Sequence, residues 1–153
     1  MRGPSDRSRP RMTQTPPPAI LRPDSLPSHD RGGGARTTPL VTRSLGATGF
    51  ISGITAFEPG AAIPLHFHDC EEQVTILEGE AVAEIDGARH PVRAGDTTWI
   101  PAGLPHRFVN AGAGPLRILW VYASTTATRT LVATGGTRPV AAEHAWPPTP
   151  QVT

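Results

Sequence analysis

The sequence predicts an all-β fold, a closed barrel or jelly roll, and two observations carry that prediction. First, 18 prolines and 16 glycines against only 37% apolar residues are too many chain-breaking residues for a helical bundle. Second, from Pro39 onward, short apolar and β-branched runs are separated by Gly, Pro or Asp about every eight to ten residues, and no segment has a helical period. A closed barrel is favoured because it hides the strand edges that an open sheet exposes.

Each run is short enough to be one strand. The Asp86-Gly87 pair predicts a tight hairpin, because a two-residue turn of this kind needs positive φ angles. A last run at residues 129–133 has two alternative uses: it closes this barrel or adds to the sheet of a second subunit. The other predicted strands span residues 40–45, 50–57, 65–68, 73–77, 81–85, 90–92, 97–100, 106–109 and 116–122.

The chain divides into one domain and two ends. We predict a single barrel domain over residues 38–134, since the length suits one core. Residues 1–37 contain a triple proline, a triple glycine and half of the 14 basic residues, all arginine, with few large apolar side chains, which predicts a disordered tail. Met12 is an alternative start codon within it. The Pro-rich end at residues 135–153 is predicted to be flexible.

Charge and cysteine content narrow the classes of partner. The formal net charge is +1 and no basic face is evident, so no nucleic-acid surface is predicted. No apolar run is long enough for a signal-peptide core or a membrane span. The single cysteine, Cys70, cannot form a disulfide within the chain. We therefore expect a cytoplasmic protein without nucleic-acid or membrane partners, and a homodimer because dimers bury sheet edges.

Three histidines and a carboxylate predict a metal site. His66 and His68 are two residues apart in a predicted strand, which places both imidazoles on one face. Glu72 follows a short acidic bend, with Glu71 as the alternative carboxylate, and His106 stands 34 residues after Glu72. Neutral imidazole and carboxylate together suit a divalent transition metal. No role is assigned to the other histidines, His29, His90 and His144.

The spacing of these residues resembles both conserved motifs of the cupin superfamily. The resemblance covers roughly residues 39–124, and Glu72, unlike Glu71, keeps the six-residue gap to Gly79 that the first motif requires. It implies a small single-domain cupin, a conical jelly-roll barrel of about six to eight strands, with one Fe, Mn, Ni, Cu or Zn ion inside, iron or manganese being favoured. The matching residues are Gly60, His66, His68, Glu72 and Gly79 in the first motif, and Gly95, Pro101, Gly103, His106 and Asn110 in the second.

Strand alternation nominates a substrate pocket beside the metal. Val74 and Ile76 should share the face of Glu72, and Phe108 should share that of His106. This predicts a mainly apolar pocket for a small-molecule substrate. Ordinary barrel packing of the same three side chains is the alternative.

Three further side chains near the motifs have weaker claims. Arg107 and Arg117 could anchor a substrate carboxylate, although Arg107 alternates away from the face of His106. Cys70 is interpreted as a small buried or bend residue. Asn110 is interpreted as a turn or hydrogen-bonding residue and not as a ligand.

Four protein ligands leave two positions of an octahedral ion open, and three functions follow. The first is a metal-dependent dioxygenase-type oxidoreductase acting on a small enolic, phenolic or thiol substrate. The second uses the ion as a Lewis acid in an isomerase, decarboxylase or polyketide cyclase, which small cupins of natural-product pathways resemble. It needs a proton shuttle, and the sequence shows no acid or base beyond the ligands, which favours the first. The third is a non-catalytic metal or small-molecule binding module.

Overall fold

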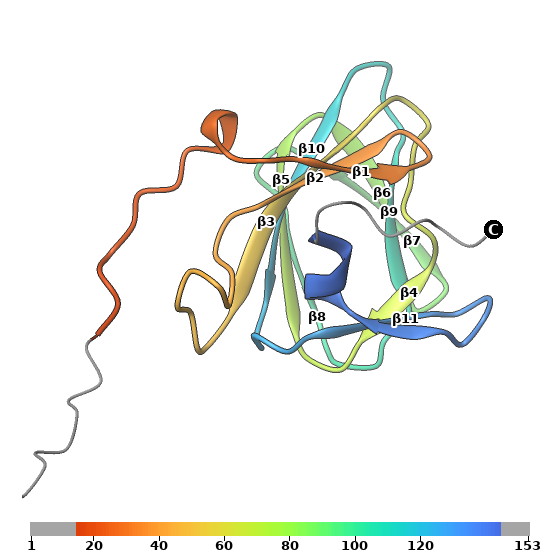
Figure 1. Ribbon diagram of the computed structural model, residues 1–153. Helices are drawn as coiled ribbons and strands as arrows, with labels where there is room; N and C mark the ends of the chain where they lie inside the picture. Colours follow the sequence, from red (N-terminus) through yellow and green to blue (C-terminus); the bar gives the residue numbers. More distant parts are fainter. Residues whose placement is uncertain (1–14, 145–153) are drawn as a thin grey trace, which may run out of the picture.

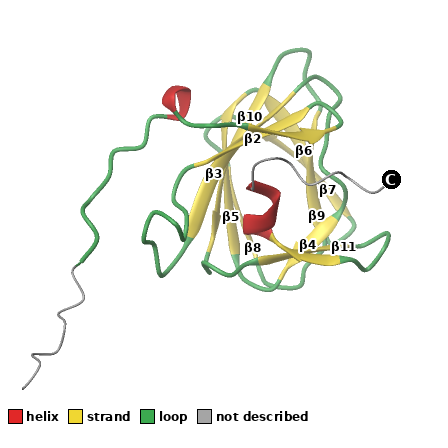
Figure 2. Ribbon diagram, in the orientation of Figure 1, coloured by secondary structure: helices red, strands yellow, loops and turns green. Residues whose placement is uncertain are grey.

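The computed structural model describes residues 15–144, which form two facing six-stranded antiparallel sheets that enclose a barrel (Figures 1 and 2). One sheet has the strand order β1-β2-β3-β10-β5-β8 and the other β12-β11-β4-β9-β6-β7. None of the helices within this part of the chain is long and apolar enough to cross a membrane. The strands are β1 (His29–Gly32), β2 (Ala35–Pro39), β3 (Ile51–Phe57), β4 (His66–His68), β5 (Glu72–Glu78), β6 (Glu80–Ile85), β7 (Ala88–Arg93), β8 (Thr97–Ile100), β9 (His106–Asn110), β10 (Leu116–Tyr122), β11 (Thr128–Leu131) and β12 (Thr137–Pro139).

The all-β prediction is confirmed, and alternating burial explains the strands. Along β10 every second side chain is buried, beginning with Leu116, and the same period holds in β5 and β9. The inward faces of the two sheets form one core. At the predicted hairpin, Asp86 has φ 49° and Gly87 φ 80°, and the turn joins β6 to β7 in register. Positive φ at both central residues suits such a turn.

The predicted tail boundary is wrong, because the barrel begins before residue 38. β1 and β2 form a hairpin, and β2 pairs with β3 along its whole length. The three glycines at positions 32–34 all have positive φ, so they make the hairpin turn and are not part of a disordered tail. Thr37 is fully buried, and its hydroxyl lies 2.8 Å from that of Thr55 on β3. Of the predicted tail, residues 1–14 lie outside the described part of the chain.

The strand predicted at residues 40–45 is also wrong, since this stretch forms the connection between β2 and β3. The Leu40 and Val41 backbone still pairs with Ser52, but the chain then turns through a hydrogen bond from the Leu45 amide to the Thr42 carbonyl. The extended run therefore lies earlier in the sequence than expected. The strand was predicted after Pro39 because that stretch is apolar, whereas the inward side chains of β2 are too small and polar to indicate a strand.

The C-terminal prediction is corrected in the same way. β11 pairs with β4 of the same chain, which selects barrel closure between the two alternatives for that strand. Residues 137–139 form β12, and a 3-10 helix, η2 (Val140–His144), follows with Val140 buried in the core. The predicted flexible end therefore begins too early; residues 145–153 lie outside the described part. η2, the dark blue helix of Figure 1, lies over the open end of the barrel.

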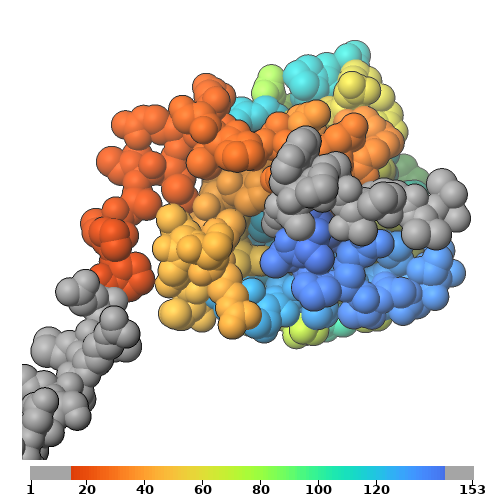
Figure 3. Space-filling view, in the orientation of Figure 1, coloured from red at the N-terminus to blue at the C-terminus, as the bar shows by residue number. Residues whose placement is uncertain are grey.

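A short 3-10 helix, η1 (Pro23–Ser25), precedes the barrel in a segment that extends away from the body of the molecule (Figures 1 and 3). Ile20 on this segment is 81% exposed. The predicted homodimer stays a prediction.

Candidate metal centre

The four predicted ligands come together inside the barrel. His66 and His68 point inward from β4, and His106 lies directly opposite His66 on β9, with ring centroids 4.6 Å apart. Glu72 enters from the first position of β5 in the other sheet. All four side chains are buried, and their donor atoms lie within 4.8 Å of one another. We call these four residues the histidine cluster.

Each imidazole is held in one tautomer by the backbone. The Nδ1–H groups donate to carbonyl oxygens, from His66 to Pro64 at 2.7 Å, from His68 to Thr128 at 2.9 Å and from His106 to Leu104 at 2.8 Å. A carbonyl can only accept, so the proton is on Nδ1 and the lone pair is on Nε2. Metal-binding histidines are commonly oriented in this way.

The turn before β9 aims His106 at the cluster. The Gly103 amide donates to the His68 carbonyl at 2.8 Å, which fastens the Pro101–Gly103 turn to β4. Asn110 closes the other end of β9 as predicted: its amide donates to the carbonyls of Phe57 and Gly114, at 3.0 and 2.9 Å. Asn110 is therefore a hydrogen-bonding residue and not a ligand.

The donor atoms fit a divalent cation. Nε2 of His68 and of His106 lie 2.8 and 3.4 Å from Oε2 of Glu72, but these three atoms make no well-formed hydrogen bond with any described residue. Buried polar atoms are rarely left without a partner. Three imidazoles and a carboxylate that converge in this way could bind a transition metal ion, and the donor types do not select one metal among several.

The electrostatics of the histidine cluster also favour a bound cation. Burial alone would raise the pKa of the Glu72 carboxyl, but contacts with His106 and His68 lower it, so Glu72 is ionised. Burial, together with the positive charge of Arg129, holds the pKa of His66 well below its usual value. Burial lowers the pKa of His106, but the hydrogen bond and charge of Glu72 raise it, and the net shift is upward. An ionised carboxylate beside imidazole nitrogens attracts either a proton or a cation.

Comparisons with known proteins agree with this geometry. The family profile described as "Cupin domain" matches residues 53–122. Protein SchB of Streptomyces halstedii is 32% identical over 102 residues, covering 66% of this chain and 74% of that protein. The chain belongs to the cupin superfamily. Polyketide synthase CurC of Streptomyces cyaneus is 36% identical over 95 residues, but this cupin spans only 61% of its length.

A solved structure confirms the cupin fold. The polyketide cyclase RemF of Streptomyces resistomycificus superposes with a TM-score of 0.65 at 23% identity, covering 80% of this chain and 84% of that one. At this level of identity the likeness concerns the fold alone.

The barrel of this cupin has twelve strands in its described part, more than the about six to eight expected from the resemblance. The extra strands are β1 and β2 at the edge of one sheet, and β11 and β12 at the edge of the other. They matter for the site because they bring further side chains next to the histidine cluster.

Two neighbours of the histidine cluster, Tyr122 on β10 and Arg129 on the extra strand β11, were missed by sequence reasoning. Tyr122 lies opposite Glu72 in the β10–β5 pair, and its ring centroid is 4.4 Å from that of His68. Arg129 lies opposite His68 in the β11–β4 pair and donates from Nη2 to the Tyr122 hydroxyl at 3.3 Å. Directly paired residues share a face, so both side chains belong to the barrel interior. Alternation from Leu116 could have placed Tyr122 inside, because it ends an inward apolar row.

Burial raises the pKa of the Tyr122 hydroxyl, Glu72 raises it further, and Arg129 opposes the shift. Tyr122 is therefore a neutral phenol that can donate a hydrogen bond.

Arg129 belongs to a buried ionic group. Its Nε lies 3.4 Å from Oε1 of Glu143 on η2, and Oε2 of Glu143 lies 3.0 Å from Nη2 of Arg31 on β1. We call Arg31, Arg129 and Glu143 the arginine cluster. Its members were not predicted, since only the folded chain brings residues so distant in sequence together.

The remaining predicted residues divide between core and surface. Val74, Ile76 and Phe108 are buried in the main core, on the faces that alternation predicted, and their contact with a substrate stays a prediction. Glu71 lies outside the cluster and accepts a hydrogen bond from the exposed Trp99 indole at 3.0 Å.

The two arginines considered as substrate anchors have partners elsewhere. Arg107 donates from Nε to Glu84 at 2.6 Å, and Arg117 lies 4.0 Å from Glu78 in a largely exposed pair. Cys70 is partly buried at the bend between β4 and β5, in keeping with its interpretation as a bend residue.

Proposed function

We propose that this cupin is a metal-dependent enzyme that closes a ring in a small polycarbonyl compound without net oxidation. The observation that carries the proposal is the pair Tyr122 and Arg129 beside the histidine cluster. From sequence alone, a Lewis-acid reaction lacked any acid or base beyond the ligands. The barrel interior contains a phenol and a guanidinium in contact with each other.

The four residues of the histidine cluster would hold the ion. When bound, a divalent ion polarises a carbonyl group and stabilises the negative charge that develops on its oxygen. In the ring closure, an enol carbon bonds to the carbonyl carbon, the enol proton is released, and the carbonyl oxygen takes up a proton.

The chain's own residues would assist at the oxygen atoms. Tyr122 donates a hydrogen bond to a substrate oxygen, and Arg129, which donates to the Tyr122 oxygen, stabilises negative charge on the phenol if its proton is transferred. The surrounding apolar core, including Val74 and Ile76, excludes water and so strengthens these interactions. The names of two similar proteins, a polyketide synthase and a polyketide cyclase, support this class of substrate.

The test combines metal content with turnover of a linear triketo thioester. We expect about one bound transition metal ion per chain and formation of a cyclised product, which becomes aromatic when the new alcohol is lost as one molecule of water. Tyr122→Phe keeps the ring that packs on His68 but removes the hydroxyl, so kcat should fall about 100-fold, as for loss of a general acid, with metal content unchanged. Normal turnover by Tyr122→Phe would remove the basis of the proposal.

A dioxygenase is the second candidate, because three histidines and a carboxylate also suit Fe(II). It needs no additional acid, so Tyr122→Phe would affect it little. An oxygen electrode separates the two: cyclisation consumes no oxygen, whereas uptake of one O₂ for each substrate converted would establish the dioxygenase and exclude the first proposal.

A further inference from the structure

We propose that Arg31 and Arg129 form a binding site for a substrate carboxylate, and that Glu143 occupies this site until the substrate displaces it. The inference rests on the proposed function in one respect, that a small organic molecule enters this barrel. It adds the chemical class of that molecule, a carboxylate anion, and a movable group that competes with it.

The position of Arg129 carries the first step. Its side chain is 5% exposed and shares the interior face with His68, one of the predicted metal ligands. Nη2 donates to Tyr122, but Nε and Nη1 are buried without a hydrogen-bond partner in the part of the chain that the structure describes. A guanidinium offers five donors in a planar fork that matches a carboxylate. Arg129 therefore has donors left for an anionic group beside the histidine cluster.

Glu143 shows which group this site accepts. Its carboxylate bridges the two arginines, with one oxygen 3.0 Å from Arg31 and the other 3.4 Å from Arg129. Neither contact has hydrogen-bond geometry, since Nε of Arg129 and Oε2 of Glu143 have no hydrogen-bond partner among the described residues. A free carboxylate could approach both guanidinium groups more closely, because no backbone would restrain it.

The element that carries Glu143 is small enough to move. η2 has only five residues and lies at the barrel opening (Figure 2). Within it, Val140 is buried and its amide donates to the Ala127 carbonyl at 2.9 Å, while Ala141 and Ala142 are exposed. A pivot at Val140 would carry Glu143 outward without breaking the barrel strands.

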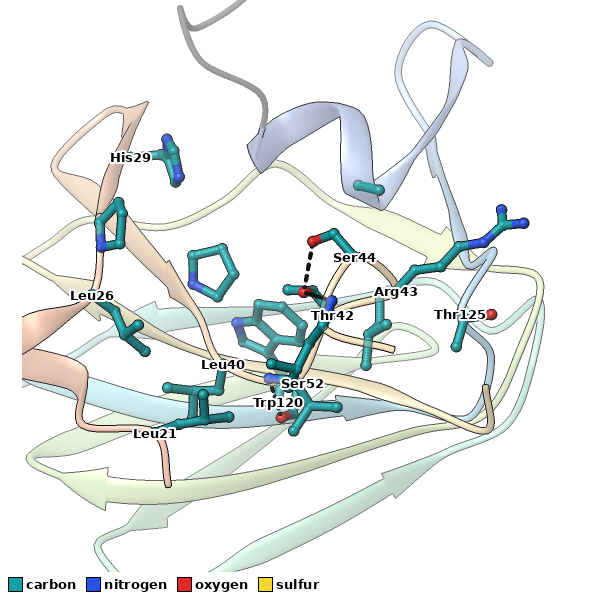
Figure 4. Close-up of a pocket in the computed structure, with 16 residues that line it drawn as sticks. Leu21, Leu26, His29, Leu40, Thr42, Arg43, Ser44, Ser52, Trp120 and Thr125 are labelled. Atoms are coloured by element: carbon teal, nitrogen blue, oxygen red, sulfur yellow. Dashed lines mark hydrogen bonds between the residues drawn. The ribbon is translucent and has the colours of Figure 1, made fainter. Parts of the chain in front are cut away.

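A neighbouring cavity offers the substrate a place to bind first. It has a volume of about 840 Å³ and lies beside η2, with His29, Trp120 and Ala141 among the residues that line it (Figure 4). None of the four predicted ligands lines it. Trp120 stacks on Tyr122 at a centroid distance of 4.9 Å, so one aromatic layer connects the cavity wall to the histidine cluster. A volume within about 300–1,000 Å³ is typical of small-molecule sites.

Charge favours an anion at this position. The arginine cluster contains two guanidinium groups and one carboxylate, and a bound divalent ion would outweigh the single charge of Glu72. Excess positive charge in an enclosed site attracts anions. A substrate carboxylate on the arginines would also leave the rest of the molecule directed toward Tyr122 and the histidine cluster.

The test measures binding of benzoate, and of its neutral analogue benzamide, to the full chain loaded with Zn²⁺, by calorimetry. We expect benzoate to bind about tenfold more tightly or better, as charge-assisted pairing with arginine predicts. Glu143→Gln removes the competing charge with little change of shape, so it should bind benzoate about tenfold more tightly than the wild type. Arg129→Gln should abolish the preference for benzoate. Glu84→Gln, which removes a carboxylate paired with Arg107 away from the barrel interior, is the matched control and should change nothing.

Hydrogen exchange in the wild type keeps the proposal testable if either buried variant fails to fold. Benzoate should increase amide exchange over residues 140–144, since Glu143 is displaced, and benzamide should not. Equal affinities for the two probes, or slower exchange with benzoate, would overturn the inference. Neither experiment measures turnover, so failure of the carboxylate-site inference would leave the ring-closing proposal standing. Failure of the ring-closing proposal would likewise leave the benzoate binding result unaffected.

Discussion

The histidine cluster and the arginine cluster are both buried in one barrel, but the chain builds them in different ways. The histidine cluster comes from residues 66 to 106, on strands β4, β5 and β9, none of which is an edge strand. The arginine cluster comes from β1, β11 and η2, elements added at the sheet edges and the barrel opening. The first is fixed by the central scaffold and the second by the two ends of the chain.

This difference separates chemistry from selection. His66 and His106 are oriented by carbonyls close to them in the sequence, Pro64 and Leu104, whereas His68 uses the carbonyl of Thr128 on β11, so two of the three imidazoles are oriented independently of the chain ends. The edge elements can vary while that geometry stays constant, and they bring charge to the same interior. We infer that the scaffold supplies the reaction and that the ends choose the molecule, a division that folds with many functions commonly show.

The largest expected effect concerns the histidine cluster. His106→Ala removes a ligand that is 1% exposed, and metal affinity should fall by more than the about 10–100-fold that loss of an outer-shell partner costs. Zinc should raise the melting temperature of the wild type and leave that of the variant unchanged, because only a state that binds the ion is stabilised. The measurements are metal content by mass spectrometry and thermal unfolding.

His90→Ala is the matched control, since His90 is exposed on β7. It should bind zinc like the wild type. If His106→Ala also binds zinc at the wild-type ratio and affinity, the histidine cluster is not the metal site.

The arginine cluster should affect stability more than metal content. Arg129→Met leaves Tyr122 without its donor and Glu143 with one cationic partner, so unfolding should cost about 3 kcal/mol less, as when a buried pair is broken. Urea unfolding of the metal-free protein measures this change. Zinc content should remain at one ion per chain, unlike in His106→Ala. Loss of zinc from Arg129→Met would show that the two clusters are one unit.

Arg107→Met provides the comparison on the outside of the barrel. Arg107 also pairs with a glutamate, but its side chain is 37% exposed. Partly exposed pairs contribute little. A loss of stability as large as that of Arg129→Met would mean that burial does not explain the difference.

The same contrast explains what could be predicted from sequence. The bounds of β8 and β10 agree with their predicted runs, because each is a short apolar and β-branched run that begins directly after Asp96 or Pro115. His66, His68, Glu72 and their turn glycines lie close together in one motif. The site could therefore be found by local spacing, and only His106 required a second motif.

The arginine cluster left no such signal. Arg31 and Glu143 are more than 100 positions apart, and each lies in a segment that composition alone described as disordered or flexible. The triple glycine at positions 32–34 was interpreted as part of a disordered tail, whereas its positive φ angles make it a hairpin turn. Whether a charged residue is buried depends on partners that approach only after the sheets have formed.

A smaller effect is expected for the reactivity of the Cys70 thiol, which lies next to the histidine cluster in the sequence. Burial, with Asp69 as the next cause, raises the pKa of the thiol from 9.0 to about 11. Since only the thiolate reacts, alkylation by iodoacetamide at pH 8 should be on the order of 100-fold slower than in the urea-unfolded chain. The rate should keep rising with pH until about pH 11. A plateau near pH 9 would contradict the prediction, and no other thiol interferes because the chain has one cysteine.

The smallest effect concerns the anchor of the movable helix. Val140→Ala removes two buried methyl groups from a side chain that is 1% exposed, which should lower the unfolding free energy by about 2 kcal/mol. Val132→Ala, at a position that is 45% exposed, should change it far less. Amide exchange in residues 140–144 should increase in Val140→Ala while exchange in β4 and β9 stays slow, because the central strands do not depend on η2. If amide exchange in β4 and β9 accelerates as much as in residues 140–144, the barrel opening and the central strands unfold together. The division between them would then be wrong.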